Sequence, residues 1–416
     1  MSYGKSNVDW QQRVNFDKLR SDRITKAHKM LNKYGIGAAI VFNWDSQRWL
    51  SDNWNHPYTK HIPWKFILLV KDAGFPYVPA VRDFDEQQVI NDAPWLKDRV
   101  ATPDVLSQPE IIKLRTFEDA GKRWAKVVGQ IKDIMKKHGV ENMPVSVDYA
   151  NPIFIEQLQK GGLKVVDGNA WILEADMVKT DQEIELMKMA AGCNEAGYSN
   201  FIHEFRAGMR EVDAISMMAK GIYGAGAEYI EGWVTNSGPR TSPRTFNWSD
   251  RVVRPGELFS LEACHVNWCG YKVCYDRTFI VGGKPTELQK ALYEITAELH
   301  HRVMGMLKPG ITSLDIDKTR PFPPKMFKGL EDLKQLRSTW YTNHFGGMGI
   351  RWDDAPTCTA SEPEVVIEKN MCLAYHSIHC VKGYEGVAIE NTYRVTDTGC
   401  ELLTKWPFDE LMVVGL

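Results

Sequence analysis

The chain has 416 residues, of which 44% are hydrophobic and 25% charged, and its formal net charge at pH 7 is −2. This length favours two domains, and the composition is typical of a folded globular protein. The small net charge excludes a strong electrostatic attraction to nucleic acid or an anionic membrane, and no apolar run reaches the roughly 18 residues of a transmembrane helix. We therefore expect a small-molecule partner.

The first 20 residues are polar and charged and lack the apolar core of a secretory signal peptide, so we expect a cytoplasmic protein. None of the eight cysteines forms a CxxC pair. Scattered cysteines in a chain of this size do not indicate a disulfide framework. We expect most of them to be buried, reduced thiols.

Between about Arg20 and Gly168, helical and strand patterns alternate, which predicts an α/β domain. A helix ending before Gly35 precedes the strand AAIVFN at 38–43, and apolar runs follow at 66–70 and 145–149. Apolar residues from Glu118 to Gly139 have helical spacing, and the glycine is a typical helix stop.

A long helix is expected to begin after Thr180, because Thr180 and Glu183 have the spacing of a capping box. We place a domain boundary just before it, near residue 170, which gives domains 1–170 and 171–416. Further along, Pro321-Phe322-Pro323-Pro324 cannot lie inside a helix and is predicted to be a surface connection.

The second domain contains four motifs in a fixed order. They are GELFSLEACHVNWCGYKVCYDRTF from Gly256, NHFGGMG around His344, LAYHSIH around His376 and GVAIENTYRV around Glu390. This order resembles the superfamily of methionine aminopeptidases, prolidases, creatinases and one type of dimethylsulfoniopropionate lyase. The resemblance implies an α/β (α+β) chain with an N-terminal creatinase-like domain and a C-terminal pita-bread catalytic domain.

The metallopeptidases of this superfamily bind two metal ions through Asp, Asp, His, Glu and Glu. In this chain only His344 and Glu390 stand where that pattern requires them, while Ala263 and Cys274 occupy the two Asp positions. We therefore do not expect a functional metallopeptidase.

The chain resembles the metal-dependent dimethylsulfoniopropionate lyases over most of its length, including EYIEGWVTNSGPRTSP and LLTKWPFDELM. The lyase's metal-ligand positions fall on Glu262, Cys264, Cys274, His344, His376 and Glu390. These residues are our candidate ligands for a single divalent ion, Zn or Fe. We favour a site without a cofactor, because loss of carboxylate ligands is also what drift produces once a metal is dispensable.

Creatinase, which works without metal, offers a second comparison. Its acidic residue before an Arg-Thr pair binds the guanidinium of the substrate together with the last Glu, and Asp276-Arg277-Thr278 and Glu390 match this arrangement. The catalytic His of creatinase lies eight residues after a Ser-Gly motif, and the same count from Ser237 gives Thr245. Creatine hydrolysis itself is therefore not expected.

We assign catalytic roles to His376, Glu390, His344 and Asp276. His344 precedes a glycine-rich stretch, and Glu390 lies in an apolar strand where a carboxylate needs a partner. Two imidazoles and two carboxylates can supply a general base and a general acid near neutral pH. A buried structural role for His376 is the alternative. His265 and His379 are expected to point to the opposite strand faces.

The chain also has 14 Trp, 15 Tyr and 16 Phe, which either pack ordinarily or form a cage for an onium or aromatic ligand. We expect a homodimer in which the segment WNHPYTKHIPW, from Trp54 to Trp64, closes the partner's pocket, as the resemblance implies. Our candidates for substrate binding are Trp64, Tyr58, His61, Tyr341 and Arg351.

The leading functional hypothesis is a small-molecule lyase that abstracts a proton and cleaves a C–S, C–N or C–C bond in an onium-type or aromatic substrate. The first alternative is a metal-independent creatinase-like amidinohydrolase or other C–N hydrolase. The second is a binding protein without catalytic activity on the same scaffold.

Overall fold

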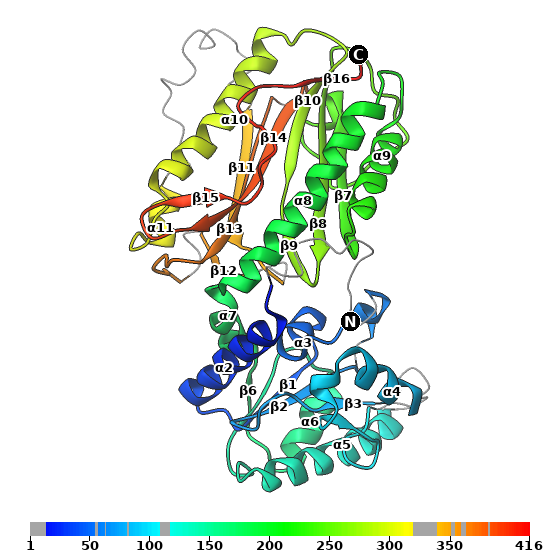
Figure 1. Cartoon of the computed structure of the whole chain (residues 1–416), viewed down its shortest axis with the longest axis vertical. Coiled ribbons are helices and arrows are strands. Elements are labelled where there is room, and N and C mark those ends of the chain that lie inside the picture. Colours follow the sequence, from blue (N-terminus) through cyan, green and yellow to red (C-terminus); the bar gives the residue numbers. More distant parts are fainter. Residues whose placement is uncertain are drawn as a thin grey trace. The chain divides into compact units, whose positions relative to one another are not determined.

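The computed structural model describes residues 14–54, 57–62, 64–80, 83–108, 117–318, 339–350, 354–358, 363–381 and 383–416. The chain divides into two compact units, residues 1–176 and 177–416, which Figure 1 shows in the colours of the sequence. The division falls within α7 (Asn169–Met177), a few residues after the boundary expected from the sequence. The predicted surface connection from Pro321 to Pro324 lies outside the described residues.

The first unit contains a four-stranded sheet of order β2-β1-β5-β6. Its strands are β1 (Ala38–Val41), β2 (Ile67–Val70), β5 (Val145–Val147) and β6 (Val165–Asp167). β1 pairs antiparallel with β2 and parallel with β5, and β5 pairs parallel with β6. The predicted α/β character and the three strands expected from apolar runs are confirmed.

Helices, short 3-10 helices and a two-stranded sheet make up the rest of the described part of this unit. Its remaining elements are α2 (Phe16–Tyr34), α3 (Trp44–Ser51), η1 (Pro57–His61), β3 (Val78–Pro79), α4 (Asp83–Asp92), η2 (Pro94–Leu96), β4 (Val100–Ala101), α5 (Phe117–Lys137) and α6 (Pro152–Lys160). The apolar face of α5, including Trp124 and Ile131, packs in a core that also contains Trp64, Phe66 and Phe154. Burial of these large side chains stabilises the unit.

The second unit begins with α8 (Asp181–Glu204) at the predicted capping box. The Thr180 hydroxyl accepts a hydrogen bond from the Glu183 N–H at 3.2 Å, and the Glu183 carboxylate accepts one from the Thr180 N–H at 2.6 Å. The other Glu183 oxygen accepts from the Tyr271 hydroxyl at 2.7 Å. The cap therefore also ties the helix start to β9 (Tyr271–Val273).

A ten-stranded sheet, with the main order β12-β11-β13-β14-β10-β8-β7, forms the body of the second unit. Its other strands are β7 (Tyr229–Ser237), β8 (Leu258–Trp268), β10 (Asp276–Val281), β11 (Thr339–Gly347), β12 (Asp354–Thr357), β13 (Cys372–Val381), β14 (Gly386–Val395), β15 (Cys400–Leu402) and β16 (Val413–Val414). β9 pairs with β8, β15 with β14, and β16 with β10.

Helices α8, α9 (Glu211–Gly224) and α10 (Glu287–Met306) lie along this sheet (Figure 1). Tyr198 of α8 donates a hydrogen bond to the Leu261 carbonyl at 2.8 Å. His300 of α10 contacts the Ser377 hydroxyl at 3.0 Å and the Ile389 carbonyl at 3.1 Å. The short elements η4 (Gly238–Arg240) and α11 (Ser313–Asp317) complete the unit within the described ranges.

Candidate active site

Strand register places the candidate catalytic positions in one row across five adjacent strands. Glu262 of β8 is paired with Asp276 of β10, Asp276 with Glu390 of β14, and Glu390 with His376 of β13. His376 is paired in turn with His344 of β11. Directly paired residues of antiparallel strands share a sheet face, so register alone gathers Glu262, Asp276, Glu390 and His376.

The row lies on the sheet face away from α10. Side chains alternate along a strand, and Ser377, the next residue after His376, contacts His300 of α10. His379 likewise contacts the Thr296 hydroxyl of α10 at 2.9 Å. His376 therefore points to the other side of the sheet, and the expectation that His379 points away from it is confirmed.

His376 lies between two carboxylates. Its Nε2 atom is 3.2 Å from Asp276 Oδ2, and its Nδ1 atom is 3.5 Å from Glu390 Oε2. Asp276 also accepts a hydrogen bond from the Ser260 hydroxyl at 3.1 Å. Among the described residues, Glu390 Oε2 accepts no hydrogen bond, and His376 Nδ1 is its ion-pair neighbour.

Arg244, from the loop after η4, reaches into the same cluster. Its guanidinium Nη2 donates to Glu262 and lies 2.7 Å from Asp276 Oδ2, while Nη1 lies 2.6 Å from His376 Nε2. The guanidinium has no acceptor atom, so in neutral His376 this contact requires an unprotonated Nε2; in the protonated ring, Nε2–H can donate only to Asp276, 3.2 Å away. The ring proton of neutral His376 is then on Nδ1, beside Glu390.

Burial and the neighbouring charges change the pKa values of Glu390, His376 and Asp276. Burial, together with Glu262 and Asp276 and against the attraction of His376, raises the pKa of Glu390 to about 7. Burial alone would lower the pKa of His376, but Glu390, Asp276 and Glu262 outweigh burial and raise it above its ordinary value. Arg244 and His376 hold the pKa of Asp276 below its ordinary value despite burial. Glu390 therefore changes its protonation state near neutral pH, while Asp276 stays ionised.

Two cysteines flank the carboxylates. The Cys264 thiol donates a hydrogen bond to Glu262 at 2.9 Å, and Cys274 is hydrogen-bonded to Glu390. Burial and the neighbouring carboxylates raise the pKa of both thiols well above its ordinary value. Both cysteines therefore stay protonated, which makes them donors to the carboxylates rather than nucleophiles.

One group of residues has the composition of a metal site. Each of Glu262, His376 and Glu390 offers one donor atom, and these three atoms lie within 4.8 Å of one another. The Arg244 guanidinium, however, already binds Glu262 and His376, and its fixed positive charge repels a cation at the same place. While Arg244 keeps this position, the residues present do not fit a metal ion.

The other predicted residues have varied surroundings. Trp64 is buried in the core of the first unit, and η1 contains Tyr58 and His61, whose side chains lie outside the described part. The same holds for the side chains of Tyr341 and His344 in β11, and Arg351 lies outside the described residues. The substrate-binding roles of all these residues therefore stay predictions.

Arg277, named in the creatinase comparison, has a structural role. Its guanidinium donates to the carbonyls of Glu390 at 2.8 Å and Pro407 at 3.1 Å, and to the Asn391 side chain at 2.7 Å. These bonds fasten the segment after β15 to the middle of the sheet. His265 lies 3.1 Å from Glu231 instead of in the row.

The sequence-based predictions missed Arg244. The count from Ser237 ends at Thr245, whose hydroxyl accepts a hydrogen bond from Asn236 at 2.8 Å, one residue past Arg244. The available signal was a basic residue in a proline-containing loop beside strands rich in carboxylates. Nothing in the spacing shows that this loop folds over the row, because its path depends on distant contacts.

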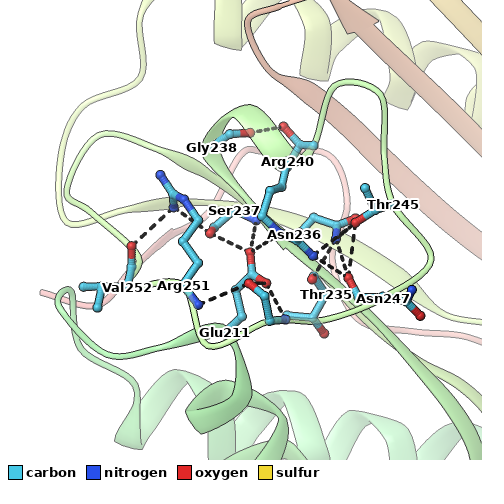
Figure 2. A network of polar contacts seen from close by, with 12 residues as sticks. Glu211, Thr235, Asn236, Ser237, Gly238, Arg240, Thr245, Asn247, Arg251 and Val252 are labelled. Carbon is cyan, nitrogen blue, oxygen red and sulfur yellow. Dashed lines mark hydrogen bonds and ion pairs between the residues drawn. The ribbon is translucent and has the colours of Figure 1, made fainter.

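Those contacts form the polar network of Figure 2, centred on Glu211 at the start of α9. One Glu211 oxygen accepts from the N–H and hydroxyl of Ser237 at 2.9 and 2.8 Å and from Arg240 Nε at 3.2 Å. The other accepts from the N–H and hydroxyl of Ser249 at 2.8 and 2.7 Å. Glu211 thereby ties together both ends of the segment that carries Arg244.

Known proteins share the fold of this chain. An Xaa-Pro dipeptidase from Bacillus anthracis superposes with a TM-score of 0.73 at 18% identity, covering 95% of this chain and 100% of that one. This likeness confirms the predicted two-domain fold with a pita-bread second domain.

Curated relatives align over nearly the whole chain. Dimethylsulfoniopropionate lyase DddP from Roseovarius nubinhibens is 21% identical over 407 residues, covering 95% of this chain and 87% of the lyase. Creatinase from Bacillus sp. strain B-0618 is 23% identical over 408 residues, covering 93% of this chain and 90% of creatinase. These relatives are enzymes, and they represent both a lyase and a hydrolase.

A family comparison agrees with the order of motifs. The sequence profile of metallopeptidase family M24 matches residues 185–397, which is just over half of the chain and contains every residue of the cross-strand row. From α8 to the end of β14, the chain follows the pattern of this family. The protein belongs to metallopeptidase family M24.

Proposed function

We propose that this protein is a small-molecule lyase that works by proton transfer at Glu390 and His376 and does not require a metal ion. The observation that carries the proposal is the buried Glu390 Oε2 atom, which accepts no hydrogen bond from the described residues and lies 3.5 Å from His376 Nδ1, in a cluster that Arg244 completes. With a pKa of about 7, the Glu390 carboxylate can both take and return a proton near neutral pH.

In the proposed reaction, Glu390 removes a proton from the carbon next to an electron-withdrawing group of the substrate. The electron pair of that C–H bond becomes the new C=C bond, and the bond to the leaving group breaks with its electron pair on the leaving group. Departure from an onium centre gives a neutral product that needs no proton. His376 Nδ1–H stands beside Glu390 and stabilises its charged form before the transfer.

Elimination suits the groups present better than hydrolysis does. Hydrolysis needs a nucleophile; Cys264 and Cys274 are held protonated and a metal-activated hydroxide does not fit beside Arg244, which leaves a water molecule activated by a side-chain base. Elimination from an onium centre needs only a base. The similarity to the dimethylsulfoniopropionate lyase over nearly the whole chain supports the same reaction class.

A creatinase-like C–N hydrolase is the second candidate, favoured by the direct pairing of Asp276 with Glu390. In the creatinase comparison, these two carboxylates bind the guanidinium of the substrate. Here Asp276 is already bound to a guanidinium of the chain itself, Arg244, at 2.7 Å. Because Asp276 is already occupied in this way, we consider the hydrolase less well supported than the lyase.

The test is a substrate panel on chelator-treated protein, followed by NMR. The panel contains dimethylsulfoniopropionate, carboxylic acids with a sulfonium or quaternary ammonium group at the β carbon, creatine, and an Xaa-Pro dipeptide with added Mn²⁺, Co²⁺ or Zn²⁺. We expect an α,β-unsaturated acid from an onium compound without added metal. Metal-stimulated dipeptide cleavage, urea release from creatine, or saturable binding of an onium compound without turnover would each overturn the lyase proposal.

A further inference from the structure

Arg244 is a buried cation in the centre of a group of anions. Its side chain is only 3% exposed and contacts Glu262, Asp276 and His376 at the same time. Burying a guanidinium is unfavourable unless anions and hydrogen-bond acceptors surround it. Both of its terminal nitrogens have such partners, so the cluster and Arg244 depend on each other.

The contacts of this guanidinium overlap those that a metal ion would need. Glu262 and His376 are two of the three residues whose donor atoms lie within 4.8 Å of one another, and Arg244 binds both of them. Asp276, the register neighbour of Glu262, is its third partner. A planar guanidinium can bridge two carboxylates and an imidazole, as a metal ion can, but with donor hydrogens in place of coordination bonds.

The loop that presents Arg244 is anchored on both sides. Glu211 binds Ser237 at one end of the loop (Figure 2) and Ser249 at the other. Between them, the Ser242 hydroxyl donates to the Val381 carbonyl at 2.6 Å, and the Thr241 hydroxyl accepts from the Gly386 N–H at 2.8 Å. The guanidinium is therefore held over β13 and β14 by contacts that do not involve the candidate catalytic groups.

We propose that Arg244 is a built-in cation that takes the place of a metal ion in this M24 site. It neutralises Glu262 and Asp276, and by donating to His376 Nε2 it fixes the ring proton on Nδ1, beside Glu390. Arg244 acts through these residues and is therefore a positioning residue. The inference rests on the proposed function only for its effect on turnover, and its main test needs no substrate.

That test measures metal binding by isothermal titration calorimetry with Mn²⁺ and Zn²⁺. The wild-type protein should show no saturable binding of either ion at the cluster, whereas Arg244→Ala should bind one ion with an affinity at least tenfold above the detection limit of the wild-type titration. The added substitution Glu262→Gln should remove that binding. Circular dichroism and thermal melting establish that each variant is folded.

A second measurement adds methylguanidinium to Arg244→Ala, which should raise its melting temperature. Arg244→Met, which keeps the aliphatic stem and fills the space, should respond much less. If Arg244→Ala does not fold alone, recovery of folding by methylguanidinium but not by methylammonium gives the same answer.

Two results would overturn the inference. One is wild-type protein that binds a stoichiometric metal ion and loses it on Glu262→Gln, which can be measured whether or not the Arg244 variants fold. The other is folded Arg244→Ala that neither binds metal nor responds to methylguanidinium. Neither result depends on turnover, so failure of the lyase proposal alone would leave these readouts unchanged.

Discussion

At the residue scale, Glu390 and His376 have different roles in the proposed proton transfer. Glu390 has a buried carboxylate oxygen that accepts no hydrogen bond from the described residues; His376 Nδ1 lies beside it, while Nε2 faces Arg244 and Asp276. The sequence suggested His376 as a candidate general base. The contacts favour Glu390 for that role, because Arg244 already uses the lone pair at Nε2.

Replacing either residue should abolish most turnover. Glu390→Gln removes the base without changing its shape, and His376→Ala removes the group that orients it. Each should lower kcat by about 10²- to 10⁴-fold in the assay for unsaturated product, with an unchanged circular-dichroism spectrum.

Cys269→Ala is the matched control for these two substitutions. Cys269 lies in the turn between β8 and β9 and already has a positive φ of 48°, which alanine would share. Its kcat should stay within about twofold of wild type. Near wild-type turnover in Glu390→Gln would show that another group takes the proton.

At the element scale, the loop between β7 and β8 decides what the site contains. β8, β10, β14 and β13 supply the anions and His376 by register alone, whereas the loop supplies the cation. Its position depends on Glu211, which is fully buried and belongs to α9. The Glu211 carboxylate thereby helps to fix the position of the Arg244 guanidinium beside the sheet.

Glu211→Gln should loosen this loop. An amide has only one accepting oxygen, so it cannot keep all the hydrogen bonds that the two carboxylate oxygens accept from Ser237, Arg240 and Ser249, and we expect a loss of about 2–4 kcal/mol in the free energy of unfolding. Hydrogen–deuterium exchange should rise in the peptide that covers residues 238–249, and denaturant titration gives the stability.

Glu204→Gln is the control for this change. Glu204 forms a surface ion pair with Lys220 at 2.6 Å, and breaking such a solvent-screened pair should leave the free energy of unfolding nearly unchanged. Equal exchange of the loop in both variants would mean that Glu211 does not hold it.

At the scale of the whole molecule, the buried side chains of Glu390 and His376 should make the free energy of unfolding depend on pH. The folded-state pKa of Glu390, about 7, lies above its ordinary value of 4.5, so the folded protein binds more protons between these values than the unfolded chain does. Its contribution to stability is complete below pH 4.5 and is lost as the pH rises through about 7. The raised pKa of His376 acts in the same direction above pH 6.5.

Glu390→Gln should therefore gain stability relative to wild type as the pH rises from about 5 to 8, by on the order of 2–3 kcal/mol. Urea titrations of both proteins across this pH range measure the difference. A difference that is constant with pH would show that Glu390 is not protonated in the folded state near neutral pH.

The association state is a second property of the whole molecule. We propose a homodimer, and two aromatic residues in the Arg244 loop are suitable contacts, since Phe246 is 80% and Trp248 is 49% exposed. Trp54, in the segment expected to reach the partner subunit, is 39% exposed. Association would remove this apolar surface from water.

Sedimentation velocity should give a dimer for wild type and a shift toward monomer for the double variant Phe246→Ser, Trp248→Ser. Tyr149→Ser, which alters a side chain that is 60% exposed in the first unit, should leave the sedimentation coefficient unchanged. A wild-type monomer with full activity would contradict the dimer.

No helix in the part of the chain described by the structure is long and apolar enough to cross a membrane.

The sequence by itself determined the elements whose signals are local. The capping box at Thr180 and Glu183, the strand at 38–43 and the helix stop at Gly139 follow from residues a few positions apart, and the structure contains each of them. The order of motifs around His344, His376 and Glu390 also identified the fold, because that order belongs to a recognisable superfamily.

Only the tertiary structure decided how the site is completed. Strand register set Asp276 opposite both Glu262 and Glu390, and the fold brought Arg244 to Glu262, which is 18 positions away, and to His376, which is 132 positions away. Local spacing cannot encode the path of this loop, which depends on Glu211 in α9 and on carbonyl and N–H groups of β13 and β14. The sequence therefore identified the anions of the site, and the packing of distant segments determined which cation they hold.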